Sequence, residues 1–353
     1  MSTQKVFEVV GLGNALVDAL VRMDEGPLLD ELGYTRGQMT PISHSDWEKV
    51  FSAVEAHGVE IQSGGSCANT IVGLGLMGAK SSYCGQIGSD ELGSLYAESI
   101  EDACGGHALS QISTHPTGKC LSIVSQVDAE RTMLSDLGAA VLLEDLGDFR
   151  TQIQQSKILH LTGYLLLGDP MATRALEAIE IAKAAGCLIS LDAADPFVIG
   201  AVGDAMWSVI REHADIVFLN REEALALCSD AGSAALEELG QYCSTVVIKL
   251  GAEGSIILHH GEETSAGIHP VEAIDTTGAG DAYAAGFLYG LVRGWPVSHA
   301  ADLGSRVAAM TVAQLGAVVR DRAMLQEAVH LAQPSGGQIA ASLAATSRSP
   351  IGG

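Results

Sequence analysis

Basic residues are scarce in this sequence. Its 353 residues include 19 Lys and Arg against 43 Asp and Glu, a formal net charge of −24. Nucleic-acid binding and docking to anionic membranes depend on clustered basic side chains, and no such cluster occurs here. The composition therefore argues against nucleic acid and membrane surfaces as partners. An anionic ligand would have to be held locally, by backbone N–H groups and a metal ion.

Paired cysteines and long apolar runs are also lacking, and no leader is expected. The seven cysteines contain no C-x-x-C pair, which predicts reduced, mostly buried thiols. No uncharged apolar run approaches the roughly 18 residues that span a bilayer, and the N-terminus runs almost directly into an expected strand. None of the 11 histidines has the spacing of a zinc site. We expect a soluble, cytoplasmic protein.

Short apolar segments alternate with helical stretches through most of the chain. The expected strands include 6–12, 81–87, 158–162, 188–192, 216–219 and 246–249. This rhythm predicts an α/β fold with a doubly wound, mainly parallel sheet flanked by helices, and ligands at the carboxyl ends of the strands. We expect one domain over residues 1–330, with a small β-sheet lid formed by about 17–42 and 110–135. Residues 333–353, rich in Ser, Gly and Ala, are expected to be a loose tail.

The strongest signal is the run Asp275-Thr-Thr-Gly-Ala-Gly-Asp281, followed by an apolar helix of small residues. The backbone N–H groups of Gly278, Ala279 and Gly280 would form an anion hole at the start of that helix. Asp281, in the first turn, would face the same anion and suits a base that accepts a hydroxyl proton. An ordinary helix cap could also place an Asp there, but the complete run favours catalysis.

This run resembles the C-terminal signature of the ribokinase (PfkB-type) carbohydrate kinase family. Four further blocks resemble that family in the same order, namely Gly64-Gly65-Ser-Cys-Ala-Asn69, Gly85-Gln-Ile-Gly-Ser-Asp-Glu-Leu-Gly93, Asn220-Arg-Glu-Glu223 and Lys249-Leu-Gly251-Ala-Glu-Gly254. The resemblance extends from residue 6 to about 320. It implies a ribokinase-like fold and an ATP-dependent kinase that phosphorylates an alcohol.

The resemblance also implies sites for nucleotide and metal. The residues expected to bind ATP are Asn220, Glu223, Lys249, Gly251, Gly254 and Thr276. Asn220 and Glu223 would hold Mg²⁺ indirectly, since hard cations prefer oxygen ligands and keep several waters. Asp275 and the Gly316 loop lie in the regions that correspond to the family's site for a monovalent cation such as K⁺, and Asp275 is the candidate ligand. Arg131 would neutralise phosphate charge on closure, although a pair with Glu130 would account for it equally.

The acceptor is expected to bind at Asn14, Asp18, Gly64, Gly65 and Asn69. Asn14 and Asp18 could grip vicinal hydroxyls, and the two glycines let the acceptor approach the backbone. The run Gly13-Asn-Ala-Leu-Val-Asp18 resembles the adenosine kinase branch of the family, which favours a purine nucleoside as acceptor.

A sugar such as ribose or fructose is the alternative acceptor. Lys249-Leu-Gly251-Ala-Glu-Gly254 is closer to the sugar kinases, and aromatics that could stack on adenine make up only 5% of the chain. Tyr164 and Phe197 are the available candidates, and both are expected in the core. A ligand sensor without catalysis is a third hypothesis, disfavoured by Asp281. The run Gly73-Leu-Gly-Leu-Met-Gly78 matches a dinucleotide fingerprint but lies within a helical pattern. Monomer and homodimer both stay open.

Overall fold

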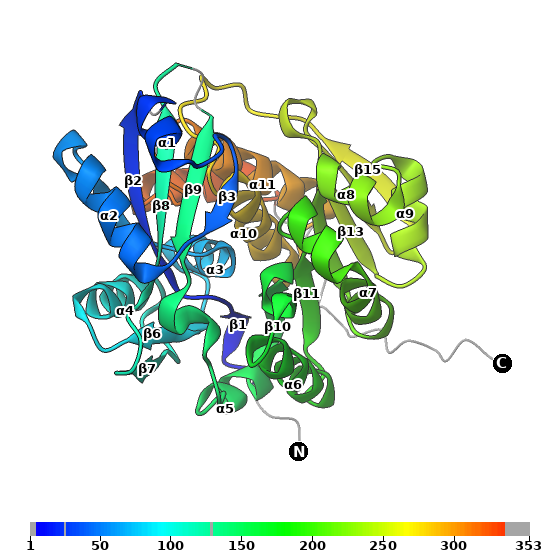
Figure 1. The fold of residues 1–353 in the computed structure, drawn as a ribbon. Coiled ribbons are helices and arrows are strands. Elements are labelled where there is room, and N and C mark those ends of the chain that lie inside the picture. The colour runs from blue at the N-terminus through cyan, green and yellow to red at the C-terminus, as the bar shows by residue number, and fades with distance from the viewer. Residues whose placement is uncertain (1–4, 25, 128–129, 336–353) are drawn as a thin grey trace.

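A mainly parallel sheet forms the centre of the computed structural model, which describes residues 5–24, 26–127 and 130–335 (Figure 1). Within these residues it has eight strands, in the order β15-β14-β13-β12-β11-β10-β1-β5. Their bounds are Glu262–Ala266, Ser255–His259, Thr245–Lys249, Ile216–Asn220, Leu188–Asp192, Ser156–Thr162, Phe7–Leu12 and Ser81–Cys84. Neighbouring strands pair in parallel along the row β5-β1-β10-β11-β12-β13. At the other edge β14 pairs antiparallel with β13, and β15 pairs antiparallel with β14. The predicted fold class is confirmed.

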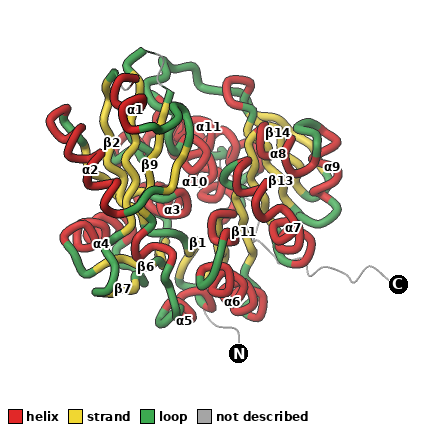
Figure 2. The backbone as a smooth tube through the Cα atoms, in the orientation of Figure 1, coloured by secondary structure: helices red, strands yellow, loops and turns green. Residues whose placement is uncertain are grey.

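Helices cover both faces of this sheet (Figure 2), and its parallel strands are buried on both sides, whereas β15 at one edge is largely exposed. One face packs against α3 (Ser66–Leu76), α4 (Glu91–Cys104), α10 (Ala279–Val292), α11 (Val297–Val312) and α12 (Arg322–Ala332). The other packs against α5 (Phe149–Gln154), α6 (Met171–Ala184), α7 (Pro196–Glu212), α8 (Arg221–Cys228) and α9 (Ser233–Gly240). Alternate residues of β1 show the division, since Val9 belongs to the first core and Val10 to the second.

Small residues bring α10 close to its neighbours. A Cβ on Gly286 would lie 2.7 Å from Cα of Gly304 in α11, and a Cβ on Gly73 of α3 would lie 3.1 Å from Cβ of Ala285. Larger side chains would separate these helices. Because α10 begins beside the predicted anion hole, this close packing fixes the position of its N-terminus.

A second sheet lies at one side of the molecule (Figure 1). Among the described residues it has five strands, in the order β3-β9-β8-β2-β4. Their bounds are Met39–Pro41, Arg131–Asp136, Gly118–Ser125, Leu16–Met23 and Glu60–Gly64. The helices α1 (Gly26–Leu32) and α2 (His44–Val54) pack on it through a separate small core. Segments far apart in the sequence thus form one sheet, and β4 joins it from outside both segments expected to form a lid.

One strand was predicted wrongly. The segment 81–87 was expected to be a single strand, but it breaks at Gly85 into β5 and β6 (Gln86–Gly88). A Cβ at Gly85 would lie 2.8 Å from the carbonyl oxygen of Gly13, so the chain turns against the backbone there. The strand β6 then pairs with β7 (Ser110–Ile112) in a separate small sheet.

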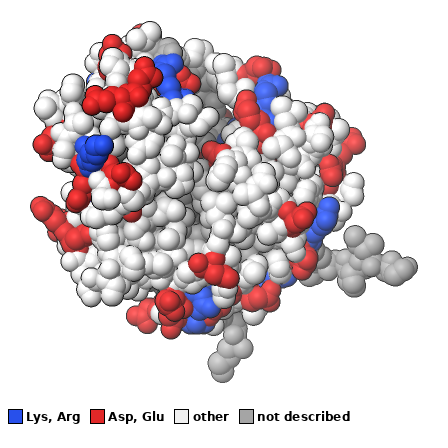
Figure 3. All heavy atoms as spheres, viewed as in Figure 1, with Lys and Arg blue, Asp and Glu red and all other residues white. Residues whose placement is uncertain are grey.

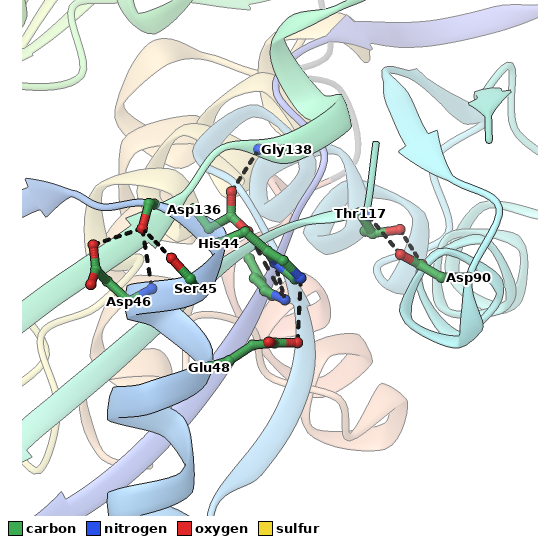
Figure 4. Close-up of polar contacts among 10 residues, drawn as sticks. His44, Ser45, Asp46, Glu48, Asp90, Thr117, Asp136 and Gly138 are labelled. Atoms are coloured by element: carbon green, nitrogen blue, oxygen red, sulfur yellow. Dashed lines mark hydrogen bonds and ion pairs between the residues drawn. The ribbon is translucent and has the colours of Figure 1, made fainter. Parts of the chain in front are cut away.

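A polar cluster joins α2 to the second sheet (Figure 4). His44 Nδ1 lies 3.0 Å from Asp136 Oδ2 and 3.1 Å from Lys119 Nζ, while His44 Nε2 lies 3.3 Å from Glu48. The Lys119 ammonium also sits 4.3 Å from the centre of the Trp47 ring. Lys119 is buried, and these contacts provide the partners that a buried charge needs.

The family-like block 85–93 has a structural role at the base of the second sheet. Asp90 caps α4 by accepting a hydrogen bond from the Gly93 N–H at 2.8 Å. It also accepts from the N–H of Thr117 at 2.7 Å and from its hydroxyl (Figure 4). Thr117 immediately precedes β8, so Asp90 ties the start of that strand to the main domain.

Acidic side chains outnumber basic ones on the face shown in Figure 3, as the net charge requires. The described helices include none that is both long enough and apolar enough to cross a membrane. All seven cysteines are free thiols, five of them buried and Cys104 and Cys228 partly buried. The expected loose tail at 333–353 lies outside the described residues from 336 onward.

Candidate active site

A cavity of about 1170 Å³ opens where the second sheet faces the carboxyl ends of β11, β12 and β13. The last residues of these strands, Asp192, Asn220 and Lys249, line it, as expected of parallel α/β folds. The predicted site residues that line the cavity are Asn14, Asp18, Gly65, Asn69, Arg131, Asn220, Glu223, Lys249, Gly251, Gly254, Thr276, Gly278, Ala279, Gly280 and Asp281. Of the remaining predicted residues, Gly64 lies against Asp18 and Asp275 against Thr277.

The predicted anion hole lies at the N-terminus of α10. Gly278 is the N-cap with φ of +70°, and a Cβ there would lie 2.5 Å from Cβ of Ala317. Only glycine fits this combination of left-handed backbone and close contact. The first turn of α10, whose N–H groups have no carbonyl of the preceding helical turn to pair with, therefore lies at the wall of the cavity, and the N–H of Ala279 there donates to Thr276 O at 3.3 Å.

Both carboxylate oxygens of Asp281 are held by α3. Ser66 Oγ donates to Oδ1 at 2.7 Å, and Asn69 Nδ2 donates to Oδ2 at 2.9 Å. Burial raises the pKa of Asp281 to about 6, although these two hydrogen bonds work to lower it. Sequence reasoning missed Ser66, which stands within the diglycine block but 215 residues from Asp281.

A lysine lies beside the anion hole. Lys249 Nζ forms an ion pair with Asp192 Oδ2 at 2.8 Å, and the two side chains are 13% and 5% exposed. A Cβ on Gly280 would lie 3.0 Å from this nitrogen. Sequence reasoning also missed Asp192. Its place at the end of a predicted parallel strand was the signal that could have found it.

Asn220 and Glu223 form a reciprocal cap at the start of α8. Asn220 Oδ1 accepts from the Glu223 N–H at 2.8 Å, and Glu223 accepts from the N–H of Asn220 at 2.7 Å and from its Nδ2 at 2.6 Å. This is a capping box. Burial first, then repulsion from Asp192, raises the pKa of Glu223 to about 7.

The donor set around this cap is consistent with a loosely held Mg²⁺. Within the described residues no group of three or more His, Cys, Asp and Glu side chains is arranged to hold a metal. Mg²⁺ is usually bound through one or two carboxylates, several waters and substrate phosphates. The buried Glu223, facing the cavity with its raised pKa, gains an opposite charge if such an ion arrives with the nucleotide.

Asp275 lies beneath the anion hole and is only 1% exposed. Its carboxylate accepts from the Thr277 N–H at 2.9 Å and from the Gly316 N–H at 3.0 Å. The Thr277 hydroxyl contacts both Asp275, at 2.5 Å, and Arg131 Nη1, at 2.6 Å. Arg131 thereby links β9 of the second sheet to the anion-hole segment.

The acceptor side of the cavity centres on Asp18. Its carboxylate packs on Gly64, where a Cβ would overlap it, and Gly65 has φ of +91° with no room for a Cβ beside Asn14 O. Burial raises the pKa of Asp18 to about 7, with Arg131 acting in the opposite direction. Asn14 Oδ1 is buried and, among the described residues, has no hydrogen-bond partner. It is therefore available to a ligand.

Apolar side chains also line the cavity. Lining residues include Leu16, Met39, Met133, Leu137 and Val141. Phe197 also lines the cavity and is 59% exposed, so the expectation that it belongs to the core is wrong. It is exposed because Asp195 caps α7 at the chain's exit from β11, which places Phe197 in the first turn at the cavity wall. Tyr164 is partly buried and lines the cavity as well.

The sequence model of the pfkB family carbohydrate kinases matches residues 37–322. The chain belongs to this family. It is therefore a kinase, a phosphotransferase with an alcohol group as acceptor, and a kinase of this family implies ATP, a divalent metal and a small-molecule substrate. The resemblance stated from the sequence motifs is confirmed.

Its relatives differ in the acceptors that their names give. The 5-dehydro-2-deoxygluconokinase of Geobacillus thermodenitrificans is 29% identical over 262 residues, 70% of this chain and 78% of the relative. Adenosine kinase from Sinorhizobium meliloti has a TM-score of 0.83 and 33% identity, over 93% of this chain and 99% of that one. A probable sugar kinase from Rhizobium etli has a TM-score of 0.85 and 29% identity, with the same coverage.

Proposed function

We propose that this carbohydrate kinase transfers the γ-phosphate of ATP to a primary hydroxyl of a sugar or sugar acid with vicinal hydroxyls. The observation that carries the proposal is the convergence of Asp281, the anion hole and Asp18 on one cavity. A base, a phosphate site and a hydroxyl-binding carboxylate are the parts that this chemistry requires. Asn14 and Asn69 each have a buried side-chain oxygen without a partner among the described residues, which an acceptor hydroxyl would satisfy.

In this proposal Asp281 accepts the proton of the acceptor hydroxyl as that oxygen attacks phosphorus. The N–H groups of Gly278, Ala279 and Gly280 stabilise the transferring group. Mg²⁺, when bound, neutralises charge on the phosphates. Asn220 and Glu223 would hold it through waters, and Gly251, Gly254 and Thr276 would contact the nucleotide. Asp275 beside Gly316 is the proposed place for a monovalent cation such as K⁺.

The second sheet is proposed to act as a lid. It contributes Asp18 and Arg131 to one side of the cavity, opposite the strand ends that carry Asn220 and Lys249. Movement of this sheet toward the main domain would exclude water and bring Arg131 to the phosphates. Its present hydrogen bond to Thr277 already places the guanidinium beside the anion-hole segment.

The acceptor expected first from the sequence was a purine nucleoside, and the comparisons support a sugar better. The relative from Geobacillus thermodenitrificans is named for a sugar acid as acceptor. A carboxylate-bearing sugar would give Arg131, whose charge acts on Asp18, a second anionic partner besides the phosphates. A nucleoside is the second candidate. The apolar side chains that line the cavity, the exposed Phe197 and the 33% identity to an adenosine kinase favour it.

An acceptor panel tests the proposal. With ATP and Mg²⁺, we would measure ADP release and phosphorylated product for 5-dehydro-2-deoxygluconate, ribose, fructose, adenosine and inosine, using the Asp281→Asn variant as a blank. We expect the highest kcat/KM for one of the three carbohydrates. A clear preference for adenosine or inosine would replace the carbohydrate proposal with the nucleoside one.

A further inference from the structure

We propose that Lys249 is a further catalytic residue, whose ammonium contacts the oxygens of the transferring γ-phosphoryl group, and that Asp192 positions it. The inference rests on the proposed function, because it assumes that the anion hole of α10 receives this group. It gives Lys249 a role in phosphoryl transfer beyond general nucleotide binding, and it gives Asp192 a role in the site.

The first observation is the position of the ammonium. Lys249 ends β13, and its Nζ lies 3.0 Å from the point that a Cβ on Gly280 would occupy. Gly280 belongs to the first turn of α10, whose N–H groups line the anion hole. The absence of a side chain at this residue leaves room for the ammonium against the helix terminus. A full positive charge thus lies beside the partial positive charge of the helix N-terminus.

The second observation is how firmly the ammonium is held. Asp192 Oδ2 accepts from it at 2.8 Å, and the other oxygen, Oδ1, accepts from the Ala194 N–H at 3.0 Å. The Phe218 ring lies beneath, 5.9 Å from Nζ. An ammonium has three donors, and Asp192 uses one. Asp192 therefore fixes the ammonium while donors remain for a ligand in the cavity, which Lys249 lines.

The third observation is the charge around it. Asp192, Glu223 and Asp281 all act on Lys249, and together they raise its pKa although burial alone would lower it. The lysine consequently stays protonated. Three carboxylates facing one ammonium make a region that would repel a nucleotide's phosphates. A fixed cation at the anion hole reduces that repulsion where charge develops on the transferring group.

A purely structural ion pair is the competing explanation for the same contacts. It predicts that loss of the pair lowers stability and affects every nucleotide equally. A contact with the transferring group predicts a selective effect instead, because only a triphosphate presents a γ-phosphoryl group. The two explanations therefore differ in the ratio of affinities for ATP-like and ADP ligands.

The experiment compares Lys249→Met, Lys249→Arg and Asp192→Asn with wild type and with Lys183→Met. Lys183 lies on α6, and its ammonium donates to Glu212 O, at the end of α7, at 3.0 Å and lies 2.9 Å from Nδ1 of the partly buried His213. Calorimetric Kd values would be measured for AMP-PNP and for ADP, each with Mg²⁺, and kcat with the acceptor found in the panel. Thermal melting would confirm that each variant is folded.

For Lys249→Met we expect kcat to fall by about a hundredfold and AMP-PNP to bind roughly tenfold more weakly, with ADP affinity nearly unchanged. Lys249→Arg should recover part of both losses, since the charge is retained, and Asp192→Asn should lower kcat less than Lys249→Met. Lys183→Met should match wild type. Equal weakening of both nucleotides, or a kcat within about threefold of wild type, would overturn the proposal.

The proposal can still be tested if Lys249→Met does not fold or if no acceptor is found. If Lys249→Met does not fold, the ratio of AMP-PNP to ADP affinity in Asp192→Asn and Lys249→Arg decides, since unchanged ratios in both would reject the contact. The binding measurement also needs no acceptor. Failure of wild type to phosphorylate any acceptor would therefore count against the proposed function alone.

Discussion

Replacing Asp281 by Asn separates the catalytic role of this residue from its structural one. The proposed base would be lost, and general-base catalysis contributes typically 10²–10⁴-fold to rate. At 1.36 kcal/mol per tenfold change, that corresponds to about 2.7–5.4 kcal/mol of barrier. We expect kcat of Asp281→Asn to fall at least a hundredfold, while the Kd for Mg·AMP-PNP stays within a few-fold of wild type.

The folded structure should tolerate this substitution and should even become more stable. An Asn at this position can still accept from Ser66, and its amide can donate to Asn69 once that side chain flips. Asn69 Oδ1 is buried and has no partner among the described residues, so the flip sacrifices no contact. The geometry of the helix terminus should therefore be retained.

The raised pKa of Asp281 determines how much stability the Asn variant gains. It is raised from 3.8 to about 6 in the folded protein, so the unfolded chain holds the charged form more easily. At about 1.36 kcal/mol per pH unit, ionisation of this carboxylate lowers the free energy of unfolding by at most about 3 kcal/mol above pH 6. This destabilisation disappears below pH 4, where the carboxyl is protonated in both the folded and the unfolded chain. Asp281→Asn should thus equal or exceed wild type in stability at pH 7.5, and the gap should close at pH 4.

The assays are steady-state kinetics from pH 5 to 8 and denaturant unfolding at pH 7.5 and pH 4. Because the base must be deprotonated, wild-type kcat should decline by about tenfold per pH unit below pH 6. A variant that keeps most of its kcat would refute the assigned base. A variant that is inactive because it is strongly destabilised at pH 7.5 would refute the account of the Ser66 and Asn69 contacts.

Two other substitutions test separate parts of the cavity. Gly64→Ala would place a Cβ where the Asp18 carboxylate now packs. We therefore expect the KM for the acceptor to rise roughly tenfold or more, with the KM for ATP unchanged. Equal effects on both KM values would show that Asp18 does not bind the acceptor. Glu223→Gln would remove a buried carboxylate of the α8 cap. We expect the Mg²⁺ concentration for half-maximal activity to rise severalfold in a metal titration. An unchanged titration would show that Glu223 does not help to bind the metal.

Local patterns predicted the parts of the site that lie within one segment. The glycines around Gly278 and the acid of the following turn were recognisable because a tight turn, free N–H groups and a helix start all lie within seven residues. The diglycine at 64–65 was recognisable for the same reason. The alternation of apolar strands and helices also predicted the parallel sheet, since its parallel strands are apolar runs buried on both faces.

Contacts between segments that are distant in the sequence could not be predicted from local patterns. Ser66 and Asp192 reach Asp281 and Lys249 only because α3 packs against α10 and because β11 and β13 flank β12. Nothing in the spacing of these residues specifies that order of strands. The break at Gly85 was missed likewise, because its cause is the carbonyl of Gly13 on another strand.

The acidic composition leads to a specific expectation about how this chain binds a polyanion. With a net charge of −24, long-range attraction cannot draw ATP to the cavity, and at physiological salt charges beyond about 8 Å are largely screened in any case. Binding must depend on short-range groups, namely the N–H groups at the start of α10, Lys249 and Arg131. These compete with Asp192, Glu223 and Asp281 in the same cavity. A divalent cation carried by the nucleotide converts the carboxylates from a source of repulsion into a source of attraction, which is why the site should bind the Mg²⁺ complex of ATP far more tightly than ATP alone.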